Sequence, residues 1–133
     1  MPTQFILDSQ KKIVYSTANG HLTLQEMLDH LGTIRQHFLD GKLDDQWAQI
    51  INFLDVDSME GVNAKAVREL IYINPWPGGC PRAIITTDKF LYGLSRMYQN
   101  LGDFKTMQVG LVHNLEEAES YISQCRETGK PSP

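Results

Sequence analysis

The segment covering residues 48–70, AQIINFLDVDSMEGVNAKAVREL, constrains the fold more than any other part of the chain. It begins with an apolar run that Asn52 interrupts, passes through an acidic turn and continues with a helix-like pattern. A strand that is apolar on both sides must be covered on both faces, so we predict a central parallel strand over residues 49–54. The acidic residues after it would lie where an open α/β sheet places a ligand or regulatory site.

Strand-like and helix-like segments alternate along the rest of the chain. Strands are expected at residues 4–7, 12–17, 82–86 and 106–112, with the first two forming a hairpin that ends at Asn19–Gly20. Helices are expected to begin at a capping box formed by Thr23 and Glu26, near residue 62, at Thr87 or Asp88, and at Asn114. The order β-β-α-β-α-β-α-β-α predicts an α/β fold in which four helices flank a mixed, mostly parallel five-stranded sheet.

Length and composition favour one soluble domain, expected over residues 1–126, with a frayed tail at 127–133. The net charge of −4 and the lack of a Lys/Arg cluster argue against nucleic-acid binding. No apolar run approaches the roughly 20 residues that span a bilayer, so no integral membrane contact is expected. The N-terminal residues lack a signal-peptide pattern, and Cys80 and Cys125 form no CxxC motif, which together predict a cytoplasmic protein.

Four segments carry a resemblance to a known family: GHLTLQEMLDHL, QIINFLDVDSM, LYGLSRMYQNLGD and QVGLVHNLEEAESYIS. They resemble a bacterial family of small SpoIIAA-like domains, themselves similar to STAS and SEC14 modules, over residues 20–123. The resemblance implies a sheet wound with helices as a βα superhelix, and a non-enzymatic regulatory or protein-interaction module of STAS-like type that forms a homodimer or binds another protein. It implies no cofactor and transfers no catalytic set. STAS antagonists carry a phosphorylatable serine in an Asp-Ser-Ser-Gly-like turn, where this chain has Asp57-Ser58-Met59-Glu60-Gly61.

The carboxyl-end rim of the predicted sheet holds the candidate ligand or regulatory residues. They follow the third, fourth and fifth expected strands: Asp55, Asp57, Ser58, Thr87, Asp88 and His113. The acidic ones could hold a divalent cation or receive a phosphoryl group, or they could simply cap the second helix. The segment lacks an EF-hand pattern and the chain lacks a GxSxG motif, so no metal site and no catalytic residue is predicted. An alternative function is a small-ligand or lipid-binding carrier with a pocket at this rim.

A possible interaction surface is formed by Trp76, Tyr92 and Arg96. Trp76 lies in a proline-glycine loop, where it could be an interface residue or could plug the end of the sheet. Tyr92 and Arg96 are four residues apart on the third expected helix, so a solvated cation–π contact between them is the alternative to a partner surface. His30 and His37 share one flank of the first helix and are expected to be solvated, with a weak contact between Glu26 and His30.

Overall fold

The structure is a computed structural model that describes residues 3–102 and 108–128. Its elements are β1 (Thr3–Asp8), β2 (Ile13–Thr23), α1 (Leu24–Leu39), β3 (Ala48–Glu60), α2 (Ala64–Tyr72), β4 (Arg82–Ile85), α3 (Lys89–Gly102), β5 (Val109–Val112) and α4 (Leu115–Thr128). The strands form one sheet in the order β1-β2-β3-β4-β5, in which only β1 and β2 are antiparallel. The predicted element order and the predicted mixed, mostly parallel sheet are therefore confirmed.

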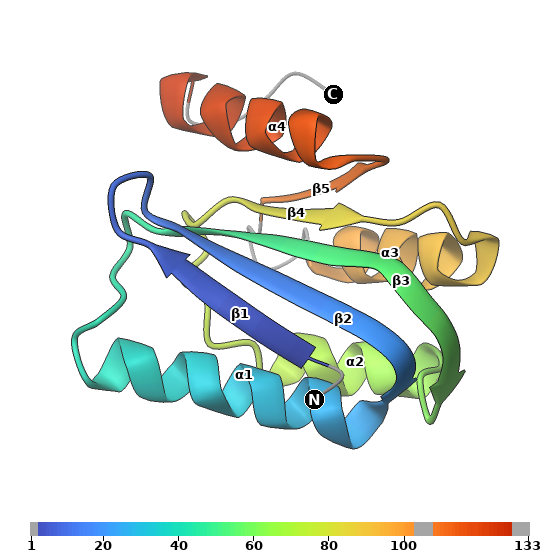
Figure 1. Cartoon of the computed structure of the whole chain (residues 1–133). Helices are drawn as coiled ribbons and strands as arrows, with labels where there is room; N and C mark the ends of the chain where they lie inside the picture. The colour runs from blue at the N-terminus through green and yellow to red at the C-terminus, as the bar shows by residue number, and fades with distance from the viewer. Residues whose placement is uncertain (1–2, 103–107, 129–133) are drawn as a thin grey trace.

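Helices α1, α2 and α3 lie on one face of the sheet and α4 covers the other (Figure 1). On the three-helix face, Val67 of α2 and Tyr98 of α3 belong to the same buried cluster as Ile84 of β4. On the opposite face, Ile122 of α4 packs with Ile50 of β3. Central strands covered on both faces must be apolar on both sides, which is why the buried run beginning at Ala48 predicted a central strand correctly.

Each of the four helices begins at a side chain that accepts a backbone N–H of its first turn. Thr23 and Glu26 form the predicted capping box of α1, and the Asp88 carboxylate accepts the Leu91 N–H at 2.9 Å at the start of α3. Asn63 caps α2, accepting from the amide of its third residue. Asn114 accepts the Glu117 N–H at the start of α4. The acidic residues after residue 54 do not cap α2, so that alternative was wrong.

Strands β2 and β3 are longer than the sequence predicts. The expected turn at Asn19–Gly20 is part of β2, and the expected loop at residues 55–61 is strand up to Glu60. The two segments pair with one another as far as Thr23 and Glu60, with irregular register on either side of the Asn19–Gly20 pair. Pairing satisfies backbone groups that a loop would leave to water, and the positive φ of Gly20 accommodates the irregularity. We call residues 19–23 and 55–60 the ribbon.

The remaining differences lie at the ends of elements. Strand β5 begins at Val109, and the first part of its expected range, residues 106–107, lies outside the described residues. Helix α4 continues to Thr128, so the first two residues of the expected tail are helical, while residues 129–133 lie outside the described part.

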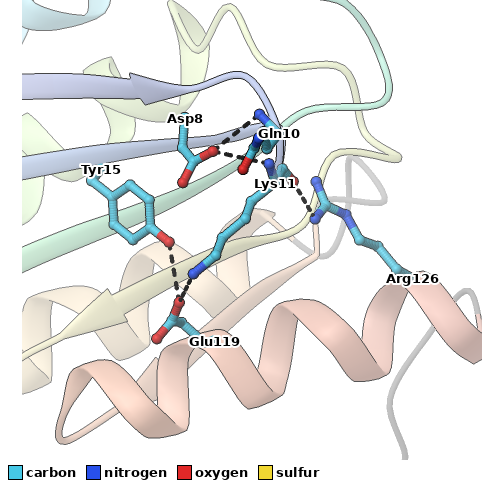
Figure 2. A network of polar contacts seen from close by, with 6 residues as sticks. All are labelled: Asp8, Gln10, Lys11, Tyr15, Glu119 and Arg126. Carbon is cyan, nitrogen blue, oxygen red and sulfur yellow. Dashed lines mark hydrogen bonds and ion pairs between the residues drawn. The ribbon is translucent and has the colours of Figure 1, made fainter.

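Helix α4 is attached to the β1–β2 hairpin by a network of polar contacts (Figure 2). The Arg126 guanidinium donates to the carbonyl oxygens of Lys11 and Lys12 at 2.8 Å and of Gln46 at 3.1 Å. The Lys11 ammonium donates to the Glu119 carboxylate at 3.2 Å. These contacts join segments about a hundred residues apart, and they hold α4 against the N-terminal end of the parallel strands.

Candidate functional site

A cavity lies between the sheet and the layer formed by α1, α2 and α3. Its volume is about 100 Å³, and its walls come from strands β2, β3 and β4 and from the three helices. Most of the lining is apolar, for example Leu22, Leu31, Phe53 and Leu94. A space of this size accommodates several water molecules or one small organic molecule. It is too small for a two-chain lipid.

A chain of hydrogen-bonded polar side chains crosses the sheet along the wall of this cavity. Gln49 of β3 and Arg82 of β4 are register partners, so their side chains lie on the same face of the sheet. Arg82 Nε donates to Gln49 Oε1 at 3.1 Å, and Gln49 Nε2 donates to Ser16 Oγ of β2 at 2.9 Å. His30 Nε2 of α1 lies 2.8 Å from the same Ser16 Oγ. This series of hydrogen bonds therefore connects three strands to a helix in the wall of a largely apolar space.

Arg82 is a buried positive charge without an acidic partner. Its side chain is only 4% exposed, and none of the ion pairs among the described residues includes it. The Nη1 group donates to Asn74 Oδ1 at 3.0 Å and to the Tyr98 hydroxyl at 2.7 Å. With the Nε bond, these use three of the five N–H donors of a guanidinium. The two donors on Nη2 have no partner within the described part of the chain.

Two further donors come from α3. Ser95 and Tyr98 are three residues apart on the helix and both line the cavity, so they lie on the same helical face. The Tyr98 hydroxyl accepts from Arg82, which leaves its own proton free to donate. Ser95 is 6% exposed, and no hydrogen bond of its hydroxyl group is found among the described residues. An acceptor inside the cavity would meet both of these donors.

His30 is the titratable neighbour of this site. Burial lowers the pKa of His30, and the positive charge of Arg82 lowers it further. The imidazole is therefore neutral at neutral pH and can accept the Ser16 proton at Nε2. The expected solvated position of His30 was wrong, and so was its expected contact with Glu26, which instead completes the α1 capping box.

Sequence reasoning missed the polar side chains that line the cavity, although a signal was present. Gln49 and Arg82 are polar residues inside the two most apolar strands, and Ser16 occupies an inward position of β2. A polar residue at a position that must be buried needs a partner or a ligand. That pattern could have identified these residues.

The structure separates the predicted rim residues from the cavity. Asp55, Asp57 and Ser58 lie on the exposed ribbon rather than in a turn. Asp88 is occupied as the cap of α3, and His113 contacts Glu117 at 3.3 Å. Thr87 is exposed, two residues after the end of β4. No hydrogen bond joins any two of Ser58, Asp88 and His113 in the described region.

Ser58 has a different partner, which the sequence did not predict. Its Oγ lies 2.8 Å from His21 Nδ1, and His21 Nε2 lies 3.6 Å from a Glu60 carboxylate oxygen. All three residues belong to the ribbon, and the side chains of His21 and Glu60 are 51% and 77% exposed. Water competes for each of these contacts, so each is weak on its own. We therefore assign this series to pairing between the ribbon strands.

The three residues of the predicted interaction surface do not form one surface, because Trp76 is buried and Tyr92 and Arg96 are exposed. Trp76 is 4% exposed and packs edge-to-face on Phe38 with ring centroids 5.1 Å apart, so it plugs the core and cannot contribute to a surface. Arg96 donates to the Tyr92 hydroxyl and lies over its ring, with its guanidinium carbon 5.4 Å from the centroid. These two residues form the solvated cation–π pair that was the alternative interpretation.

Two kinds of feature are absent from the described residues. No group of three or more His, Cys, Asp and Glu side chains there is arranged to hold a metal ion. No helix there is long and apolar enough to cross a membrane.

The fold has a known counterpart. Comparison with protein families finds no match, and comparison with curated proteins finds none either. Among solved structures, an uncharacterized protein of the DUF3478 family with a SpoIIAA-like fold, from Shewanella loihica, superimposes with a TM-score of 0.59. The two are 14% identical in sequence, and the match covers 90% of this chain and 91% of that one. The chain therefore has the SpoIIAA-like fold that its sequence motifs predicted.

Proposed function

We propose that this protein is a non-enzymatic module that binds a small, largely apolar molecule in the cavity between the sheet and helices α1 to α3. The observation that carries the proposal is the cavity of about 100 Å³, whose largely apolar walls include the hydrogen-bonded side chains of Ser16, Gln49 and Arg82. Ligand sites commonly combine apolar walls with a few convergent polar groups. The small-ligand carrier, which was the alternative function in the sequence analysis, is thus the function that we favour. Its proposed pocket is the cavity inside the fold rather than a site at the rim.

Contact with another protein or with a second copy is the second candidate. The resemblance implies it, and the side chains of Ile6 and Leu39 are each 70% exposed. Single exposed apolar side chains are common on soluble proteins. The burial of Trp76, which was expected to be part of an interaction surface, weakens this candidate further.

Native mass spectrometry of the protein purified gently from its own cells tests the proposal. We expect the wild-type protein to retain a small molecule. A Leu94→Trp variant, which fills the cavity from α3, should lose it. An Asn100→Trp variant, which places the same side chain on the exposed side of α3, should keep it.

A solution experiment gives the second arm of the test. Toluene, added to the isotopically labelled protein, should shift NMR signals of cavity residues in the wild type and in Asn100→Trp, but not in Leu94→Trp. A protein that is empty as purified and shows no such shifts would overturn the proposal. The native mass spectra also report the subunit number, which tests self-association.

A further inference from the structure

The polar end of the cavity has the chemistry of a receptor for one negative charge. We infer that the ligand is a small monocarboxylate, whose apolar body fills the cavity and whose carboxylate is bound by Arg82, Tyr98 and Ser95. This inference rests on the proposed function and adds the chemical class of the ligand.

The first argument is the uncompensated charge of Arg82. Burying a guanidinium costs free energy unless an anion or several hydrogen bonds replace its hydration. Here Gln49, Asn74 and Tyr98 supply three neutral acceptors, and the Nη2 donors are left over. The same three bonds fix the guanidinium in place. A bound anion would therefore meet an oriented donor group rather than a mobile surface side chain.

The second argument is that the groups next to Arg82 are also hydrogen-bond donors. Tyr98 and Ser95 both line the cavity, and the hydroxyl group of each has a proton to donate. A carboxylate accepts hydrogen bonds and donates none, so it suits a site made of donors. Hydrogen bonds between ionised partners are also shorter and stronger than neutral ones.

The number of charges selects a monoanion. Arg82 is the cationic side chain that lines the cavity, and His30 is held neutral by burial and by Arg82 itself. One carboxylate would balance one guanidinium. A phosphate monoester carries between one and two negative charges at neutral pH, and the excess would be buried without compensation. The cavity volume of about 100 Å³ limits the body of the ligand to a short chain or a single ring.

Calorimetric titration with matched probes tests the inference. Hexanoate and hexanamide have the same shape and differ in charge, and phenylacetate and phenylacetamide form a second pair. We expect each acid to bind the wild-type protein about 10- to 100-fold more tightly than its amide, which is the range for hydrogen bonds to a charged group. Hexyl phosphate should bind more weakly than hexanoate.

Variants test whether the preference for acids over amides depends on Arg82. Arg82→Gln should reduce the preference for the acid to near zero, whereas Arg96→Gln, which removes the same charge from the exposed side of α3, should leave it unchanged. If Arg82→Gln fails to fold, Tyr98→Phe and Ser95→Ala remove single donors, and each should weaken acid binding several-fold with little effect on the amide.

The outcomes separate this inference from the proposed function. Equal binding of acids and amides would overturn the carboxylate receptor and leave the cavity as a site for neutral molecules. Tighter binding of hexyl phosphate would also overturn it. If neither acids nor amides nor toluene bind, the proposed function itself fails.

Discussion

The aromatic ring of Tyr121 in α4 lies directly against the backbone of Gly110 in β5. A Cβ atom built on Gly110 would be only 2.7 Å from Cδ1 and Cε1 of that ring. The bare backbone of β5 is thus what allows α4 to pack this closely on the sheet. Because the ring is part of the packed layer, it cannot move aside without disturbing its neighbours.

Replacing Gly110 with alanine should therefore destabilise the protein by about 1–3 kcal/mol, the usual cost of overpacking. Urea denaturation followed by circular dichroism measures this change. Gly32→Ala is the matched control, since Gly32 lies in α1 with nothing within 4 Å of its built Cβ. That substitution should raise stability by about 0.5–1 kcal/mol. A neutral Gly110→Ala would mean that α4 packs less closely than described.

Arg126 should matter more for stability than the neighbouring ion pair. It donates to three backbone carbonyl groups from two segments of the chain, whereas Lys11 and Glu119 form one pair with side chains 57% and 37% exposed. We expect Arg126→Met to lower the free energy of unfolding by about 1–2 kcal/mol. Lys11→Met should change it little, because exposed pairs are weakly stabilising. Equal urea midpoints for the two variants would contradict this ranking.

The two cysteines should be unreactive in the folded protein. Burial raises the pKa of Cys80 to about 11, and burial also raises the pKa of Cys125. At pH 8 the thiolate of Cys80 is then about one part in a thousand, and the thiolate is the reactive form. We expect slow reaction with a disulfide reagent in buffer and rapid reaction of both thiols in urea. A Ser123→Cys variant adds an exposed thiol on α4 and should react at once. Rapid labelling of either thiol in the folded wild type would contradict its burial.

The sequence predicted the order of elements because hydrophobic periodicity and caps are local signals. The stripe of α1, its capping box and the cap at Asp88 all depend on residues within a few positions of one another. The length of β2 and β3 was not predictable in this way. Polar residues such as Asn19 and Asp55 are typical of turns, and only their pairing with each other keeps them in strands.

The cavity was beyond prediction for a similar reason. Arg82 reaches Gln49 across 33 positions and Tyr98 across 16, so each side chain alone looks like an exception in a strand or helix. Trp76 illustrates the converse, because a tryptophan between prolines looks exposed until Phe38 is placed beside it. Sequence patterns identified polar residues at the rim of the sheet. They could not show which polar side chains the fold brings together in the cavity.

His30 should make the stability of the protein depend on pH in one direction. Burial and the charge of Arg82 lower its pKa in the folded state, while the unfolded chain keeps a value near 6.5. The unfolded state therefore binds a proton first as the pH falls. The contribution of neutral His30 to the free energy of unfolding is fully present above about pH 6.5. It is lost as the pH drops through and below that value.

We expect the free energy of unfolding of the wild type to fall between pH 7.5 and pH 5.5, and His30→Gln to reduce that fall. Urea titrations at several pH values provide the measurement. An unchanged slope in His30→Gln would show that the imidazole is hydrated in the folded protein. It would then also remove the argument that His30 is neutral, so that the polar end of the cavity could balance more than one negative charge.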